Sequence, residues 1–296
     1  MLTIMRAFVG CAFLALSVSL AAHAQSGVGV ELEEVTDDRY SEGMLTGACR
    51  LQVNLTGNGL DKASAARIVV KEAKDDRGNS LYDEPMSNDF TPRDQNNGSL
   101  QFSLKQPARA ATSVRIKGTV ELYVPARDPN AIVKIDKALA KPDAPLASKG
   151  LKAAKVDLTL LSPAGYSKLM KTRKITDADI EKIRAEGKKR GVSEKEVEAM
   201  IGFAKAMEGM DESAPDGSVI LSGKKSDFDR IFRVEVLGAD GKPVDVGSRS
   251  SSTRGDDTVM MMQPNAPPPA NASLQIFLLT DKSRLSFPFE MNVPLP

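Results

Sequence analysis

The sequence predicts a mainly β protein made of two antiparallel β-sandwich domains, the second of which carries an inserted α-helical hairpin. Three observations support this prediction: apolar and polar residues alternate in short segments, one order of strands and turns occurs twice, and the second occurrence is interrupted by a helical stretch. Alternation with a period of two is typical of strands that bury one face. Strands separated by turn residues at short, regular spacing favour a sandwich.

The first residues have the features of an export signal. Arg6 precedes an uncharged apolar run over residues 7–20, and Ala-His-Ala at residues 22–24 supplies the small residues that a signal peptidase recognises. The run is shorter than the roughly 20 residues of a membrane-spanning helix. We therefore expect residues 1–24 to be a signal peptide cleaved before Gln25, and the mature protein to be periplasmic or secreted without a membrane span.

Two parts of the chain repeat the same pattern. Each part begins with Leu-(Thr or Ser)-Gly, followed by an apolar strand and a turn that contains Asp and Gly. A strand with alternating apolar residues then ends in Gln-Pro, and a further strand rich in apolar residues follows. These features lie at residues 55–57, 67–72, 75–78, 100–107 and 114–122, and again at 221–223, 231–236, 239–241, 259–264 and 274–278. The strand patterns at 30–35 and 156–161 also correspond. The repeated unit resembles an immunoglobulin-like sandwich in its pattern.

The repeat suggests a division of the chain into domains. We expect a first immunoglobulin-like β-sandwich at residues 25–130, a linker at 131–153 and a second β-sandwich at 154–296. The linker contains prolines among Ala, Lys and Asp, a composition typical of a semi-stiff spacer. Val133 and Ile135 have the spacing of a short strand within it.

The second unit contains a helical insertion at residues 163–210. A short helix is expected from Pro163 to about residue 172, because proline is favoured in the first turn. Two further helices are predicted by sequences with the spacing of a capping box, Thr-x-x-Asp at 176–179 and Ser-x-x-Glu at 193–196. Gly191 ends the first of these two helices, so the pair is expected to form an antiparallel hairpin.

The candidate site is an apolar stripe on the last helix of this hairpin. Its residues recur at helical spacing and are Val197, Met200, Ile201, Ala204 and Met207. Ile180 and Ile183 supply a facing stripe on the preceding helix. In one interpretation the hairpin lays the stripe on a sheet of the second domain. In the other the stripe is partly open and receives a partner peptide or helix, because methionine side chains repack easily.

The composition excludes several kinds of chemistry. Cleavage of the signal removes His23, the only histidine, and leaves Cys49 as the only cysteine. Without histidine, Ser-His-Asp and Cys-His catalysis are excluded, and the usual zinc and copper sites lack their ligands. The mature chain carries 39 basic and 39 acidic residues, a balance that argues against nucleic-acid binding. We expect Cys49 to be a buried side chain of a strand.

Oxygen-rich loops are the remaining metal candidates. One contains Asp94, Asn96 and Gly98, and the other contains the Asp-Asp pair at 75–76 with Asn79. Neither has the closing glutamate of the twelve-residue calcium loop, so ordinary turns are favoured over metal sites. We expect no cofactor and no metal.

These features predict an exported, non-catalytic binding or scaffold protein of the cell envelope. It would act through its loops and helical hairpin on another envelope or secreted protein. The alternative is a periplasmic hydrolase that uses carboxylates or a Ser-Lys pair. That alternative is less favoured because adjacent acids in a strand, such as Asp256 and Asp257, point to opposite faces, and because no tryptophan is present to form a sugar platform.

The export signal gives a first testable expectation. In the envelope fraction of the source cells, the N-terminal residue of the protein should be Gln25, as measured by intact mass and N-terminal sequencing. The Ala24→Phe variant should accumulate as the precursor, because a bulky side chain does not fit the small-residue position of the cleavage site. The matched Gln25→Ser variant should be processed normally. Recovery of the protein with residues 1–24 still attached would contradict the prediction.

Overall fold

The computed structural model describes residues 27–38, 47–82, 89–93, 98–172, 176–189, 191–206 and 213–296. With 45% strand and 22% helix the protein is mainly β, as the sequence predicts, and its strands form several antiparallel sheets. The predicted signal peptide at residues 1–24 lies outside the described residues. Among the helices that are described, none has the length and apolar character needed to cross a membrane.

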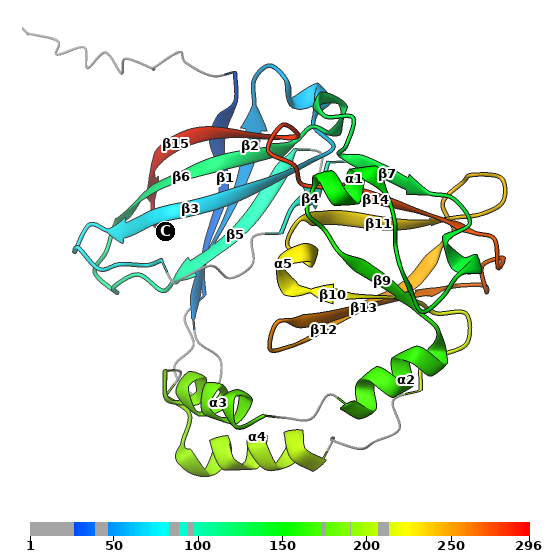
Figure 1. Cartoon of the computed structure of the whole chain (residues 1–296). Helices are drawn as coiled ribbons and strands as arrows, with labels where there is room; N and C mark the ends of the chain where they lie inside the picture. The colour runs from blue at the N-terminus through cyan, green and yellow to red at the C-terminus, as the bar shows by residue number, and fades with distance from the viewer. Residues whose placement is uncertain are drawn as a thin grey trace, which may run out of the picture.

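Two sheets face each other in the part of the fold that we call the first sheet pair (Figure 1). Their strand orders are β1-β2-β5 and β15-β6-β3-β4. The strands are β1 (Gly29–Asp38), β2 (Ala48–Thr56), β3 (Ala65–Asp75), β4 (Thr91–Pro92), β5 (Ser99–Lys105), β6 (Ser113–Tyr123) and β15 (Arg284–Pro294). Alternate side chains of the two sheets, among them Leu51, Phe102, Ile68 and Ile116, meet in one buried core. Cys49 is fully buried in this core, as predicted.

The second sheet pair is built in the same way. Its sheets have the strand orders β12-β13-β10-β9-β8 and β11-β14-β7. The strands are β7 (Ile132–Ile135), β8 (Ala144–Pro145), β9 (Leu158–Leu161), β10 (Val219–Lys224), β11 (Ile231–Leu237), β12 (Val246–Arg254), β13 (Asp257–Pro264) and β14 (Ser273–Leu278). Leu158, Leu221, Val234 and Ile276 lie in its core. Two short helices, α1 (Lys149–Ala153) and α5 (Lys225–Phe228), belong to this half.

The predicted insertion is present between β9 and β10. It consists of α2 (Pro163–Thr172), α3 (Asp177–Lys189) and α4 (Glu194–Ala206). Both predicted capping boxes form: the Asp179 amide donates to Thr176 Oγ1 at 3.2 Å, and the Glu196 amide donates to Ser193 Oγ at 3.4 Å. Gly191 ends α3 with a φ of +69°, a left-handed conformation that glycine adopts without strain.

The two sheet pairs repeat one arrangement of strands. β1-β2-β5 in the first corresponds to β9-β10-β13 in the second, and β6-β3 corresponds to β14-β11. The turn after the third strand of each copy is also alike. The Leu81 amide donates to the Ala73 carbonyl at 2.9 Å, and the Val244 amide donates to the Val236 carbonyl at 2.8 Å. The repeated order of strands and turns read from the sequence therefore corresponds to a repeated topology.

The division of the chain differs from the prediction at residues 131–153 and at the C-terminal end. β7, within the expected linker, pairs with β14 and buries Val133 in the second core. β15, expected in the second domain, pairs along its length with β6 of the first sheet pair. Each sheet pair thus receives its final edge strand from the other half of the sequence. Local alternation predicts a strand but does not identify its partner, because any strand with the right apolar pattern can complete a sheet edge.

β15 is suited to the edge of the first sheet pair. Its alternate residues Leu285, Phe287, Phe289 and Met291 pack against the first core. Phe289 lies opposite Gly118 of β6, where an added Cβ would meet the phenyl ring at 2.7 Å. The aromatic ring therefore occupies the space that the glycine leaves open. Pro288 lies within the strand, which is tolerated because an edge strand has unpaired amide positions.

The two connections that cross between the sheet pairs are bonded to each other. The Val124 amide donates to the Ser283 carbonyl and the Leu278 amide donates to the Ala131 carbonyl, each at 2.7 Å. Nearby, the Thr280 hydroxyl donates to the Asp128 carboxylate at 2.7 Å. Aromatic rings from both halves, Phe90, Tyr123, Phe232 and Phe277, cluster at the same junction. The crossing is therefore a packed, hydrogen-bonded element.

The buried Asp128 carboxylate gives a test of this junction. Its hydrogen bonds from the Thr280 hydroxyl and the Asn130 amide hold its pKa below the usual value. Because the folded-state pKa is lowered, this stabilisation is present above the ordinary aspartate pKa of about 3.9 and is lost as the pH falls through the folded-state pKa. Asp128→Ala should lower the free energy of unfolding at pH 7 by about 1 kcal/mol, because the part-buried Thr280 hydroxyl and Asn130 amide lose their acceptor.

Urea unfolding at pH 7 and at acidic pH measures this effect. The difference between wild type and Asp128→Ala should shrink at acidic pH, where the wild-type carboxylate is protonated as well. Asp281→Ala is the matched control, because among the described residues Asp281 forms only an exposed ion pair with Arg284, at 3.2 Å. Its effect should stay below about 1 kcal/mol. Equal losses in the two variants would contradict the account of the junction.

Candidate partner-binding surface on the helical hairpin

Helices α3 and α4 pack on each other. Val197 and Ile201 of α4 and Ile180 of α3 are buried in one small apolar cluster, with Ile183 and Val192 at its margin. This cluster consists of hairpin residues alone within the described ranges. The interpretation in which the stripe lies on a sheet of the second unit is therefore wrong for Val197 and Ile201. Two amphipathic helices joined in a hairpin bury their apolar stripes against each other before either stripe can pack on a sheet.

Gly187 allows the two helices to approach closely. A Cβ on this residue would meet the Val197 side chain at 2.4 Å. The Arg184 guanidinium bridges the helices at the side of this contact, pairing with Glu198 at 2.9 Å and with Glu181 at 2.7 Å. The facing stripe predicted from Ile180 and Ile183 is thus confirmed, and an exposed ion pair joins the two helices beside it.

The predicted site residues separate into two groups. Val197 and Ile201 are buried and Ala204 is half-buried, so these three belong to the inner face of α4. Met200 is 55% exposed and is not part of the apolar cluster between α3 and α4. Met207 lies outside the described residues.

Phe203 is the residue that the sequence interpretation missed. It is 68% exposed and follows Met200 by three positions, so both side chains lie on one side of α4. The same spacing was visible in the sequence, but Phe203 falls off the stripe that faces α3. Met200 and Phe203, with the exposed Ala199, form what we call the α4 patch. Of the three exposed large hydrophobic side chains in the described part of the chain, two are in this patch.

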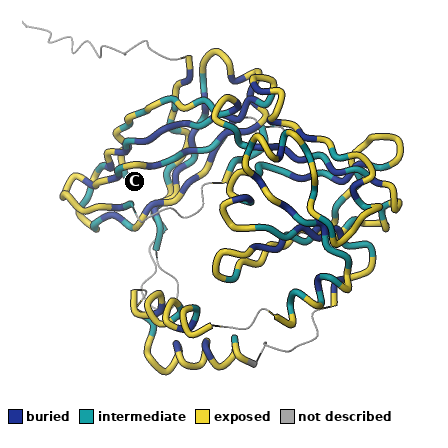
Figure 2. Tube along the Cα trace, viewed as in Figure 1, coloured by how far each residue is buried: buried dark blue, intermediate teal, exposed yellow. Residues whose placement is uncertain are grey.

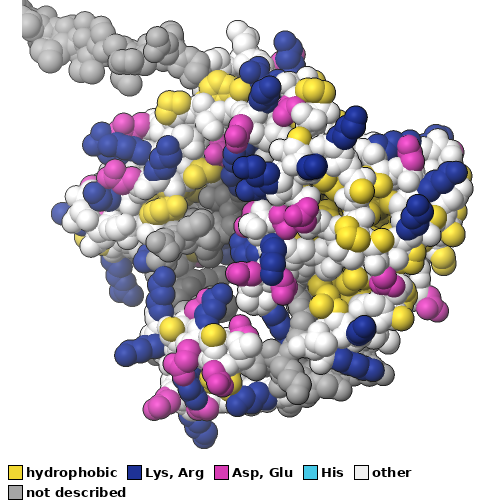
Figure 3. Space-filling model, viewed as in Figure 1, with side chains coloured by type: hydrophobic (Ala, Val, Ile, Leu, Met, Phe, Trp, Pro, Cys, Tyr) yellow, Lys and Arg dark blue, Asp and Glu magenta, His cyan; other side chains and the backbone are white. Residues whose placement is uncertain are grey.

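Exposure of the hairpin is evident along most of its length (Figure 2). Buried residues concentrate in the two sheet pairs, whereas α3 and α4 contain few. Side chains of both charges cover the visible face of the hairpin, with small hydrophobic areas between them (Figure 3). An apolar spot rimmed by charged residues is typical of a surface that another protein covers.

Helix α2 anchors the insertion to the second sheet pair. Tyr166 of α2 is buried against Ile220 of β10 and Val259 of β13. The Ser162 hydroxyl caps α2 by accepting from the Gly165 amide at 2.9 Å, and it donates to the Asp143 carboxylate at 2.7 Å. Ala214, which follows the hairpin, is buried in the same cluster, so the insertion is anchored to a packed scaffold, while the side chains of the α4 patch are exposed.

Asp75 and Cys49 serve the fold, while Asp94 and Asn96 of the other predicted loop lie outside the described residues. Asp75 accepts hydrogen bonds from the amides of Arg77, Asn79 and Ala108 at 2.8–3.1 Å, so its oxygens stabilise the turn. Within the described ranges no group of three potential ligands is placed to hold a metal ion. Burial, with a smaller effect from Asp37, raises the pKa of Cys49 to about 11, so its thiol is a poor nucleophile at neutral pH.

The surroundings of Lys224 bear on the Ser-Lys hydrolase alternative. A cavity of about 560 Å³ beside β9, β10 and β13 is lined by Ser222, Lys224 and Asp257. The Lys224 ammonium pairs with Asp257 at 2.7 Å, and this hydrogen bond raises the pKa of the lysine. A catalytic lysine base needs the opposite shift, since it must be neutral to accept a proton. This serine and lysine therefore lack the electrostatics of a catalytic pair.

Comparisons of the chain with protein-family models, with curated proteins and with solved structures found no match.

The two faces of α4 should respond differently to truncation. Ile201→Ala should lower the free energy of opening of the hairpin by about 2 kcal/mol or more, because it removes a buried side chain from a small cluster. Met200→Ala should change it by less than about 0.5 kcal/mol, because the methionine is exposed. Hydrogen exchange of the α3 and α4 amides measures both. Similar effects of the two variants would show that the hairpin packs differently.

Proposed function

We propose that this chain is an exported, non-catalytic binding protein of the cell envelope that contacts a partner protein through the α4 patch. The observation that carries the proposal is the exposure of Met200 and Phe203 on a hairpin whose own apolar cluster is already complete. When a partner covers an exposed aromatic ring and a methionine, their apolar surface is removed from water, and this burial favours binding. Export is supported by the sequence of residues 1–24.

The proposed fold is a pair of immunoglobulin-like sandwiches. The orders β1-β2-β5 and β15-β6-β3-β4 agree with the two sheets of such a unit, and the second sheet pair has the corresponding orders. Domains of this architecture serve as rigid scaffolds from which loops and insertions contact other molecules. The hairpin between β9 and β10 is such an insertion.

A non-catalytic role agrees with the chemistry of the described residues. Lys224, which lines a cavity together with Ser222, has its pKa raised by Asp257 and so stays protonated at neutral pH. The buried carboxylates of Asp75 and Asp128 have lowered pKa values. Both accept hydrogen bonds from neighbouring groups of the protein, such as the Asn79 amide and the Thr280 hydroxyl. Groups of this kind stabilise a scaffold and are unsuited to proton transfer near neutral pH.

Photo-crosslinking in the source cells tests the proposal. A photoreactive phenylalanine analogue at position 203 should crosslink to one discrete envelope protein, because the patch is expected to be covered by a partner. The same analogue at Lys205, an exposed residue on the opposite side of α4 from Phe203, should give little or no such product. Adding Met200→Asp should abolish the crosslink at 203 without altering the circular dichroism of the protein. Equal products at 203 and 205, or none at either position, would contradict the proposal.

A further inference from the structure

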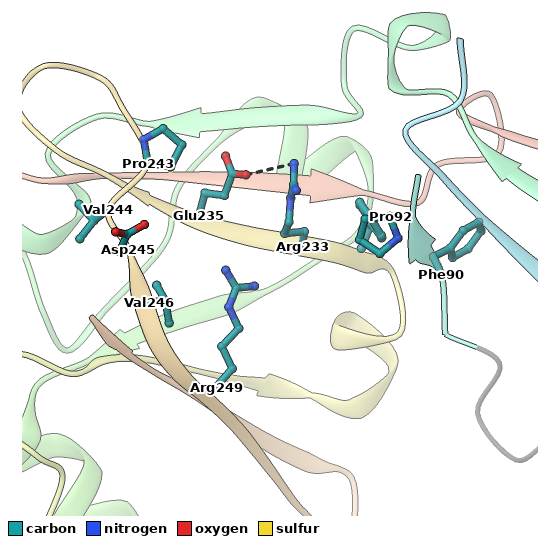
Figure 4. A pocket seen from close by; sticks show the side chains of 10 residues that line it. Phe90, Pro92, Arg233, Glu235, Pro243, Val244, Asp245, Val246 and Arg249 are labelled. Atoms are coloured by element: carbon teal, nitrogen blue, oxygen red, sulfur yellow. Dashed lines mark ion pairs between the residues drawn. The ribbon is translucent and has the colours of Figure 1, made fainter. Parts of the chain in front are cut away.

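A cavity of about 470 Å³ lies where the first sheet pair approaches the second. Phe90 and Pro92, at the edge strand β4, form the wall from the first sheet pair. The other walls come from β11, from the connection after it and from the start of β12 (Figure 4). A volume of this size holds a small molecule, and clefts between domains are frequent ligand sites.

Two arginines define one end of this cavity. Arg233 of β11 pairs with Glu235 at 3.0 Å, and its guanidinium lies 4.5 Å from the centre of the Phe277 ring. Its position is therefore fixed by an ion pair and by cation–π contact. Its Nε is buried and has no hydrogen-bond partner within the described part of the chain.

Arg249 of β12 points toward Arg233 across the cavity (Figure 4). Its guanidinium forms no ion pair or hydrogen bond with any residue that the structure describes, and Glu235 is the nearby acid that partly offsets its positive charge. Removal from water, followed by the proximity of Arg233, lowers the pKa of Arg249. Two arginines that share one carboxylate leave an excess of positive charge, which a second anion would offset.

We propose that this cavity binds an organic carboxylate with an apolar body, and that Arg249 and Arg233 receive the carboxylate group. The planar guanidinium matches the two oxygens of a carboxylate and binds them with paired hydrogen bonds. The side chains of Phe90, Phe232 and Val246 offer an apolar surface for the rest of the ligand.

The charged residues that line the cavity favour a ligand with a single negative charge. Glu235 already neutralises one of the two arginines through its ion pair with Arg233, which leaves one positive charge at this end. The other acid of the cavity, Asp245, lies beside Val244, away from the arginine pair (Figure 4). A dianion such as phosphate would carry excess charge next to two carboxylates and would leave the apolar walls uncovered.

Isothermal titration of the full chain with octanoate tests the inference, and acetate, octanamide and inorganic phosphate serve as comparison ligands. Octanoate should bind more tightly than the other three, because it alone combines a single negative charge with an apolar chain. Arg249→Met should weaken octanoate binding about tenfold or more, as expected for loss of a charge-assisted hydrogen bond. Arg249→Lys should retain part of the affinity, because it keeps the charge.

Arg254→Met is the matched control, since Arg254 lies on the same strand but outside the cavity. It should leave octanoate binding unchanged. Three results would overturn the inference. Octanoate could fail to bind at millimolar concentration, Arg249→Met could leave octanoate binding unchanged, or phosphate or octanamide could bind more tightly than octanoate. Because the α4 patch takes no part in this cavity, these outcomes are independent of the crosslinking result.

Discussion

The reciprocal exchange of edge strands between the two sheet pairs is the constraint on which the rest of the structure depends. β15, the last strand in the chain, completes the sheet of β6, while β7, which follows β6 directly in the sequence, completes the sheet of β14. An open edge presents unpaired amides and carbonyls, and covering it removes a site for unwanted pairing. Here each half of the sequence covers an edge of the other, so neither sheet pair is complete without both halves.

This arrangement explains the packing at the junction. The two connections must pass each other, and they do so through short backbone hydrogen bonds, the buried Asp128 and an aromatic cluster. The cavity with Arg233 and Arg249 lies next to this crossing, with walls from both sheet pairs. A site shared in this way keeps its shape only while the halves stay together. The hairpin, by contrast, lies in the connection between β9 and β10 and has an apolar cluster of its own, and Met200 and Phe203 of α4 stay exposed.

The sequence predicted which segments form strands and helices more accurately than it predicted which strands pair with each other. Period-two alternation located most strands, and the Thr176 and Ser193 capping boxes located α3 and α4 within a residue. The exchange was missed because the pattern of β15 shows only that it has one apolar face. β7 was assigned to a linker because it is short and has prolines on both sides. β12 was missed because its residues are almost all exposed serine, threonine and arginine, which leaves no apolar alternation to detect. On α4 the inner residues Val197 and Ile201 were grouped with the outer Met200, because a helical stripe does not reveal which of its members a neighbouring helix covers.

Engineered disulfides test the strand exchange most directly. In a Cys49→Ala background, one variant carries cysteines at the opposed residues Arg115 and Asn292, and a second carries them at Lys134 and Gln275. Directly opposed residues of antiparallel strands lie close enough for a disulfide. Both variants should form an intramolecular bond on mild oxidation, as measured by mass spectrometry of non-reduced peptides. A third variant with cysteines at Arg115 and Lys134 should not, because it joins β6 to β7. Efficient bonding in the third variant, with none in the first two, would show that each half keeps its own strand and would contradict the account.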